Sequence, residues 1–186
     1  MAMAAQPPAQ PPANPDPQQQ PECAVCLQVA LLPFTFPACR HTFCFTCAKG
    51  VLMIGNHNCP FCRGDVDANI FNRPAQPLDL KMVNPDVAPE AVNEEPMYWL
   101  YAGRNTDWWR YDPRTEADIE AIYKTGVDNS TFVILGKTYA INFRQMIQWP
   151  IDATSNVSNR NVRRVSSQEF DEMVVKGIAG VFNQQN

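Results

Sequence analysis

Seven cysteines and one histidine constrain this chain more than any other feature of its sequence. They lie between Cys23 and Cys62 in the order Cys-x2-Cys-x12-Cys-x1-His-x2-Cys-x2-Cys-x11-Cys-x2-Cys, with His41 in fourth place. Structural zinc takes four thiolate or imidazole ligands in a closed tetrahedron, so these eight ligands predict two zinc ions with no cysteine left over. The few apolar residues between the ligands can build only a small core, and zinc binding supplies the folding free energy that such a module needs.

Prolines divide the rest of the chain. The 186 residues contain 17 prolines against 8 glycines, and the prolines gather in residues 7–21 and 74–96, where a continuous core has no use for them. Within the cysteine-rich segment, residues 44–52 are expected to form a short helix that ends near Gly55. The predicted organisation is a disordered Pro/Gln-rich tail at 1–21, a zinc module at 22–70, an extended linker at 71–96, a second module at 97–182 and a short tail at 183–186.

The second module has the pattern of a small α+β domain. One helix is expected to begin near Thr115, where Thr115 and Asp118 resemble a capping box ahead of an apolar stripe. We predict a half-open sheet with this helix packed on it, and we expect Trp99 and Trp108 in its core. The strand-like segments, rich in aromatic and β-branched residues, are 98–101, 108–111, 131–135, 137–141, 146–149 and 161–165.

The chain as a whole is acidic, with a formal net charge of −4 and a pI near 5.1, so a polyanion would have to bind a local patch. We expect Arg110 and Arg114 on the solvated surface. No segment has the roughly 20 apolar residues of a membrane span and no signal peptide is visible, so we expect a soluble intracellular protein that binds no membrane and no DNA. Residues 137–164 supply a basic patch with a single acid: Lys137, Arg144, Arg160, Arg163 and Arg164 against Asp152.

With its histidine in fourth place, the ligand order resembles that of RING fingers. RING fingers mostly act as ubiquitin ligases that dock a ubiquitin-conjugating enzyme (E2). Because no cysteine remains here to carry ubiquitin as a thioester, we predict direct transfer from the E2 to the substrate, without a catalytic residue in this chain. The resemblance also implies a cross-brace of ligand pairs: Cys23, Cys26, Cys44 and Cys47 for one zinc, and Cys39, His41, Cys59 and Cys62 for the other.

The same resemblance implies which residues contact the E2 and ubiquitin. These are Val25 between the first two ligands, Pro60 between the last two, and Arg63, which matches the family's linchpin arginine. Many RING fingers place a tryptophan where this chain has residues 51–53, so Met53 is expected to supply the apolar contact there. Val25 and Met53 could instead be core residues. If the E2 bound the RING finger only weakly, the protein would instead be a non-catalytic adaptor with a structural RING finger.

Aromatic and basic motifs of the second module suggest its ligand. They are Tyr98-Trp99-Leu100-Tyr101-Ala102-Gly103-Arg104, Trp108-Trp109-Arg110-Tyr111-Asp112, Glu116, Met146-Ile147-Gln148-Trp149 and Lys176-Gly177-Ile178-Ala179-Gly180. This arrangement resembles a WWE domain, which in that family binds iso-ADP-ribose, the unit of poly(ADP-ribose) that spans the bond between consecutive residues. Gln148 would bind the adenine edge, with Trp109 as apolar wall. The full implied set is Tyr101, Arg104, Trp109, Tyr139, Gln148, Arg160, Arg163 and Lys176. Either Arg160 or Arg163 can face the ligand, and we favour Arg160.

Taken together, residues 22–182 resemble the Iduna-type RING–WWE ubiquitin ligases, which depend on poly(ADP-ribose). The resemblance implies a protein of the cytosol, and also of the nucleus, that ubiquitinates poly(ADP-ribosyl)ated proteins for degradation. It implies iso-ADP-ribose as an allosteric ligand of the RING finger, and tankyrase and axin as partners in Wnt signalling. Besides the adaptor, a single-stranded nucleic-acid binder is a further alternative, against which the acidic pI counts.

Overall fold

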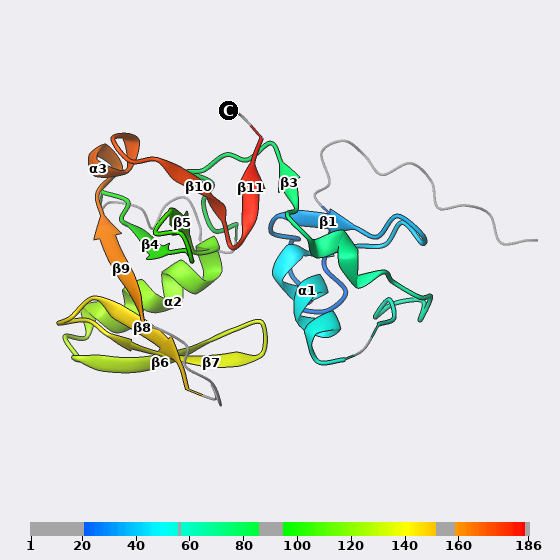
Figure 1. Ribbon diagram of the computed structural model, residues 1–186, viewed down its shortest axis with the longest axis horizontal. Coiled ribbons are helices and arrows are strands. Elements are labelled where there is room, and N and C mark those ends of the chain that lie inside the picture. The colour runs from blue at the N-terminus through cyan, green and yellow to red at the C-terminus, as the bar shows by residue number, and fades with distance from the viewer. Residues whose placement is uncertain (1–20, 56, 86–94, 152–158, 185–186) are drawn as a thin grey trace, which may run out of the picture.

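The computed structural model describes residues 21–55, 57–85, 95–151 and 159–184. Most of the predicted N-terminal tail (1–20), the later part of the predicted linker (86–94) and residues 185–186 of the predicted C-terminal tail lie outside this part of the chain. The described residues form a cysteine-rich module, residues 21–71, beside an aromatic module, residues 97–184 (Figure 1). Within the described ranges, no helix is both long and apolar enough to cross a bilayer.

In the part of the chain that the structure describes, the cysteine-rich module is a short hairpin followed by one helix. Strands β1 (Pro33–Thr35) and β2 (Thr42–Cys44) pair antiparallel, and helix α1 (Phe45–Met53) begins at the next residue. A 3-10 turn, η1 (Ala68–Phe71), ends the module. The helix predicted at residues 44–52 is thus present, with its start shifted by one residue. The small core combines apolar residues with ligand cysteines: Leu31, Phe36, Phe43, Ala48, Leu52 and Val66 with Cys23, Cys44 and Cys59.

Within the described residues, the aromatic module is built on a sheet of nine strands in the order β3-β11-β10-β5-β4-β9-β8-β7-β6. Strand β9 connects the two halves of the sheet, because it pairs with β8 at its start and with β4 further along (Figure 1). The predicted small α+β fold is confirmed. The strands are β3 (Ala75–Gln76), β4 (Tyr98–Ala102), β5 (Trp108–Arg110), β6 (Asn129–Ile134), β7 (Lys137–Asn142), β8 (Ile147–Pro150), β9 (Arg160–Val165), β10 (Val175–Ile178) and β11 (Val181–Asn183).

Helix α2 (Pro113–Lys124) covers the sheet and packs Ile119 against Trp99 and Tyr111. The capping box predicted at Thr115 and Asp118 is wrong. The helix begins earlier, because the Asp112 carboxylate accepts a hydrogen bond from the Thr115 N–H and Pro113 fits the first helical position.

A short second helix, α3 (Ser167–Asp171), was not predicted from the sequence. Its capping box is formed by Ser166 and Glu169, each of which satisfies a backbone N–H of the other. The signal was therefore present in the sequence, but the helix is too short to show an apolar period.

Arg110 is buried, so its prediction as a surface residue is wrong. It is 2% exposed and forms an ion pair with the buried Glu116, whose Oε1 also accepts the Trp99 N–H at 2.8 Å. The remaining guanidinium nitrogen, Nη1, donates to the carbonyls of Leu80 at 2.8 Å and Met82 at 2.9 Å. Arg110 therefore joins the sheet to the segment that precedes the aromatic module.

That segment was predicted as an extended linker, which is wrong for its first half. Strand β3 pairs in parallel with β11, and the Phe182 N–H donates to the Pro74 carbonyl at 2.8 Å. Leu78 is buried in an apolar cluster that contains residues of both modules. Burial of this side chain holds the segment against the two modules. The buried members of this interface cluster are Leu32, Phe45, Leu78, Ile178 and Val181.

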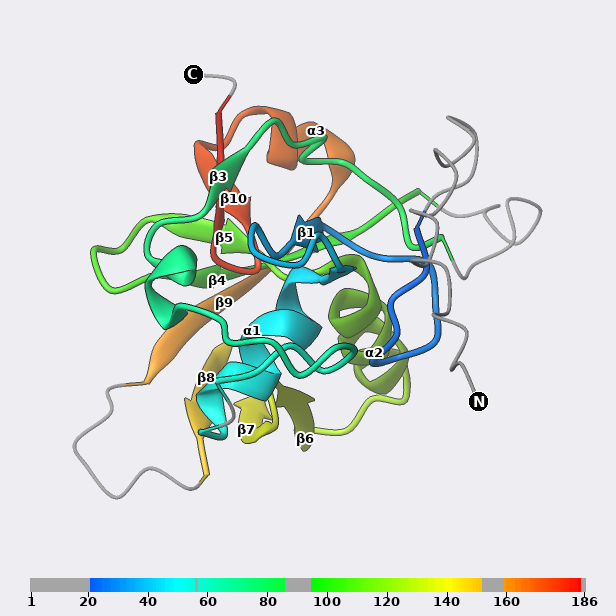
Figure 2. The same ribbon diagram turned by 90° about the vertical axis from the view of Figure 1, so that its right-hand side faces the viewer.

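The first turn of α2 makes a further contact between the modules. The Arg114 guanidinium donates from Nη2 to the Val29 carbonyl at 2.8 Å and from Nη1 to Cys44 Sγ at 3.5 Å. Its prediction as a solvated surface residue is wrong, because these acceptors lie on the other module, which local sequence cannot indicate. Figure 2 shows α1 in front of α2 when the molecule is seen from the cysteine-rich side.

Candidate functional site

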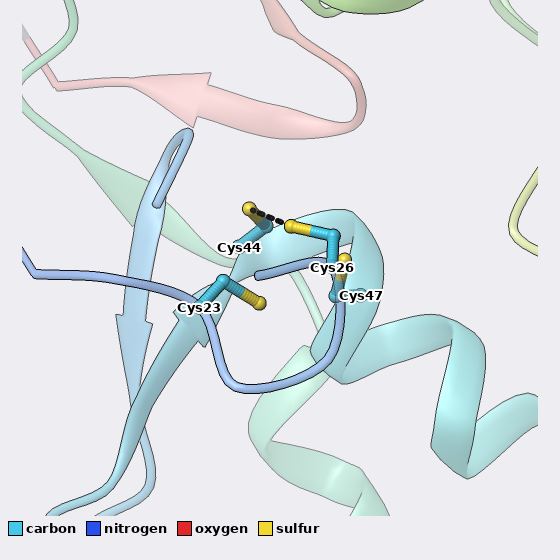
Figure 3. Close-up of side chains that lie close together, drawn as sticks. All are labelled: Cys23, Cys26, Cys44 and Cys47. Carbon is cyan, nitrogen blue, oxygen red and sulfur yellow. Dashed lines mark hydrogen bonds between the residues drawn. The ribbon is translucent and has the colours of Figure 1, made fainter. Parts of the chain in front are cut away.

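The eight candidate metal ligands gather in two groups of four. Within each group the ligand atoms lie within 4.8 Å of one another, and the groups are those that the cross-brace implies: Cys23, Cys26, Cys44 and Cys47, and Cys39, His41, Cys59 and Cys62. In the first group, two ligands come from the loop before β1, one from the end of β2 and one from the first turn of α1 (Figure 3).

The spacing of these atoms suits tetrahedral zinc. A Zn–S bond of about 2.3 Å gives a tetrahedral edge of about 3.8 Å. The Sγ atoms of Cys26 and Cys44 are 3.7 Å apart, and Cys59 Sγ lies 3.6 Å from His41 Nδ1. Both donor sets therefore fit a structural zinc ion, which would hold the loops together.

The loops reach this geometry through two turns with the same hydrogen bonds. Leu27 N–H donates to the Cys23 carbonyl and Arg63 N–H to the Cys59 carbonyl, each at 2.8 Å. Leu27 and Arg63 follow the second cysteine of their pairs and adopt left-handed φ angles of 59° and 61°. This conformation is strained for residues with a Cβ, and it brings the two thiols of each pair to one side of the chain.

The Cys44 thiol is prepared to act as a thiolate. A hydrogen bond with Cys47 is the main cause that lowers the pKa of Cys44 to about 5, against the opposing effect of burial. The Leu31 N–H, at 3.2 Å, and the Arg114 guanidinium act in the same direction. Because zinc binds the deprotonated thiol, these donors favour metal binding, and one of them comes from the aromatic module.

The residues assigned to E2 and ubiquitin contact lie on the surface. Val25 is 39% exposed and Met53 is 49% exposed, so neither is a core residue. Pro60 and Arg63 are also exposed. Sequence reasoning missed Phe61, an exposed ring 4.6 Å from the His41 ring, although it stands between two ligands just as Val25 does.

A cavity of about 310 Å³ lies where the aromatic module faces α1. Its size is at the lower end of small-molecule sites. Strand β9 places Arg160 directly opposite Gln148 of β8, which brings both side chains to the cavity. Of the residues assigned to iso-ADP-ribose, those that line it are Tyr101, Arg104, Trp109, Tyr139, Gln148 and Arg160.

The structure does not bring Arg163 and Lys176 to this cavity. The Arg163 guanidinium stacks 4.8 Å from the centre of the Trp108 ring, beside a different hollow. The turn after β10 lines the cavity with Ala179 and Gly180, whereas Lys176 of β10 does not line it. Both turn residues have positive φ, a conformation that glycine adopts without strain. Of the two tryptophans expected in the core, Trp99 is buried, whereas Trp108 is half-buried beneath Arg163.

Two buried polar atoms at the cavity have no hydrogen-bond partner within the described residues. Gln148 is 3% exposed, and within the described residues neither its Oε1 nor the Tyr111 hydroxyl has a hydrogen bond. A buried polar atom without a partner costs about 1 to 3 kcal/mol, so such atoms in a cavity indicate a ligand. Burial raises the pKa of Tyr101 and of Tyr111, which keeps both phenols protonated as donors.

The second module supplies only part of the wall. Thr46 and Lys49 of α1 also line the cavity, although they belong to the cysteine-rich module. Burial lowers the pKa of Lys49, whose ammonium lies 5.4 Å from the centre of the Phe45 ring. Sequence reasoning missed both residues, because nothing local marks a side chain whose partner is on another module.

Comparison with protein families assigns both modules. A model of the C3HC4-type zinc finger (RING finger) matches residues 19–68, and a model of the WWE domain matches residues 97–164. The chain thus consists of a RING finger followed by a WWE domain, and we use these names for the two modules below.

Curated relatives resemble the chain across both domains. E3 ubiquitin-protein ligase RNF146 of Homo sapiens is 32% identical over 162 residues, which are 87% of this chain and 41% of that protein. RNF146-A of Bos taurus is 30% identical over 161 residues, 87% of this chain and 42% of that protein. The rnf146 protein of Xenopus tropicalis is 31% identical over 162 residues, 87% of this chain and 46% of that protein. The chain is homologous to the RNF146 E3 ubiquitin ligases and spans less than half the length of these relatives.

Proposed function

We propose that this protein is a RING-type E3 ubiquitin ligase that binds poly(ADP-ribose) through its iso-ADP-ribose unit and ubiquitinates poly(ADP-ribosyl)ated proteins for degradation. The observation that carries the proposal is the shared cavity, where Gln148 and Arg160 of the WWE domain face Lys49 of the RING finger. The relatives named above, which are E3 ubiquitin-protein ligases, support the activity.

The groups around the cavity suit the ligand. The Gln148 amide, with its unpartnered Oε1, can accept a hydrogen bond from an adenine amino group, and the Trp109 indole offers an apolar wall. Arg160 lines the same cavity and, within the described residues, its guanidinium has no hydrogen bond or ion pair. Charge-assisted bonds from arginine to phosphate are among the strongest that a site can offer.

The RING finger would contribute orientation instead of covalent chemistry. All seven cysteines lie in the two zinc ligand sets, so none is left to accept ubiquitin from the E2. Zinc would hold the loops that present Val25, Pro60 and Phe61 to the E2. Arg63 would donate hydrogen bonds to the E2 and ubiquitin, which restrains the thioester in a reactive pose.

The shared cavity gives the ligand a means to act on the RING finger. A ligand bound to Arg160 and Lys49 together favours arrangements in which α1 lies against the WWE domain. It shifts the population only as far as its affinities for the two arrangements differ. In this proposal tankyrase and axin are reached through the polymer that they carry.

An in vitro ubiquitination assay with an E2, with and without iso-ADP-ribose, tests the proposal. We expect chain formation to rise when the ligand is added. Gln148→Ala should remove the rise by weakening binding, and Lys49→Ala should reduce the rise while the activity without ligand stays unchanged. Absence of chain formation with several E2 enzymes under both conditions would favour a non-catalytic adaptor.

A further inference from the structure

A second cavity borders the ligand cavity at Arg104 and Trp109, which line both. Its volume is about 560 Å³. The additional wall comes from Arg73, Asn105, Asp107 and Phe182. A ligand that extends past Arg104 therefore enters a space that already has cationic and aromatic walls.

Arg73 reaches this cavity because the segment after the RING finger is part of the sheet. The Phe182 N–H donates to the Pro74 carbonyl at 2.8 Å, and Gln184 donates from Nε2 to the Ala75 carbonyl at 3.1 Å. Arg73 itself adopts a left-handed φ of 52°, a conformation that costs about 1 to 2 kcal/mol for a residue with a Cβ. The β3–β11 pairing thus fixes the backbone on which the Arg73 side chain is carried.

The side chains of the second cavity have the chemistry of a phosphate and sugar site. Within the described residues, neither Arg73 nor Arg104 has a hydrogen bond or ion pair, so both guanidinium groups are available to an anion. The Trp109 and Phe182 rings meet edge to face, with centroids 4.8 Å apart, and form an apolar wall. The Asp107 carboxylate can accept hydrogen bonds from ribose hydroxyls, and a single carboxylate beside two guanidiniums leaves the site cationic.

We propose that this second cavity binds the outer phosphate of the pyrophosphate bridge and the next ribose, the groups that continue the polymer beyond the iso-ADP-ribose unit. The inference rests on the proposed function, because it extends the same ligand from one cavity into the next. The WWE domain would then bind the part of the polymer that follows iso-ADP-ribose, as well as iso-ADP-ribose itself. A ligand that ends at iso-ADP-ribose fills only the first cavity.

Calorimetry with two compounds tests this proposal: iso-ADP-ribose and the ADP-ribose dimer, which contains a single iso-ADP-ribose unit and so gives no statistical advantage. We expect the dimer to bind wild-type protein about tenfold more tightly, which is the gain that a charge-assisted bond provides. Arg73→Gly, which suits the left-handed backbone, should bind both compounds equally and keep the wild-type affinity for iso-ADP-ribose.

Arg163→Ala serves as the matched control, because it removes an arginine beside a different hollow, where it stacks on Trp108. It should keep the preference for the dimer. Equal affinities of wild-type protein for both compounds, or a preference that persists in Arg73→Gly or is lost in Arg163→Ala, would overturn the second site. Failure of wild-type protein to bind iso-ADP-ribose at all would instead contradict the proposed ligand.

Discussion

At the scale of single residues, two side chains of the first cavity destabilise the protein when no ligand is bound. Gln148 and Tyr111 bury polar atoms that have no partner within the described residues. Each such atom destabilises the free state by about 1 to 3 kcal/mol, and a ligand that supplies the missing hydrogen bond recovers this free energy. Binding residues of this kind can be separated from packing residues by experiment.

Gln148→Met should separate the two effects. Methionine has a similar shape and removes the unpartnered amide oxygen, so the free energy of unfolding should stay the same or rise by up to about 1 kcal/mol. Affinity for iso-ADP-ribose should fall by at least about tenfold. Urea unfolding and calorimetry on the same preparation check both outcomes. A variant that unfolds more easily and still binds would mean that Gln148 is a structural residue.

The opposite behaviour is expected of Arg110. Its replacement by methionine leaves Glu116 buried without its cation and removes the donor to the Leu80 and Met82 carbonyls. Loss of one partner of a buried ion pair costs about 3 to 5 kcal/mol. Urea denaturation followed by tryptophan fluorescence should show this loss, and the double variant Arg110→Met/Glu116→Gln should recover part of it. A change below about 1 kcal/mol would contradict the role given to this pair.

At the scale of elements, the first turn of α2 is an unusual place for a cation. The N-terminus of a helix carries a partial positive charge, which disfavours arginine there. Arg114 is compensated by the Val29 carbonyl and by Cys44 Sγ on the RING finger. A helix of the WWE domain thus supports one of the two zinc sites.

Arg114→Ala should therefore loosen one zinc ion selectively. Hydrogen bonds to metal ligands typically change metal affinity about 10- to 100-fold. Zinc transfer to a chromophoric chelator should divide into a faster phase, from the site that contains Cys44, and an unchanged phase from the site that contains His41. Thr35→Ala, which changes the exposed side of β1, is the control. Equal acceleration of both phases would indicate general loosening of the fold.

Local sequence patterns predict those elements whose stabilising contacts lie nearby in the chain. The ligand order led to the two zinc groups only through the RING-finger resemblance, whereas aromatic density within a few neighbouring residues located β4 and β5. Arg110, Arg114 and the segment around Leu78 were misread, because their partners lie on distant parts of the chain. Lys49 was missed for the same reason. Such positions are set by the tertiary contact between two modules, which no local periodicity describes.

At the scale of the whole molecule, the zinc site that contains Cys44 and Cys47 is linked to the ligand cavity through α1. Cys44 precedes this helix and Cys47 lies in it, while Thr46 and Lys49 of the same helix line the cavity. Removal of zinc would release the start of α1 and with it part of the cavity wall. By thermodynamic linkage, a ligand whose binding depends on zinc must also strengthen zinc binding.

Both directions of this linkage are measurable. Chelation of zinc should weaken iso-ADP-ribose binding, and saturating ligand should slow zinc release to the chelator. In Lys49→Ala, zinc removal should weaken iso-ADP-ribose binding less, because the RING finger then contributes less to the cavity. Ligand affinity that is the same before and after complete zinc removal would show that the WWE domain binds by itself.

The pairing of β3 with β11 has a consequence for synthesis of the chain. Leu78 donates its N–H to Asn183 Oδ1, a partner 105 residues further along the chain. At about 5 to 20 residues per second, a ribosome needs roughly 5 to 20 s to make that interval. The RING finger can take up zinc while translation continues, but the segment that follows it has to wait for the last strand. During this interval Leu78 and Phe45 lack their Ile178 and Val181 partners, so the nascent chain exposes apolar surface that chaperones recognise.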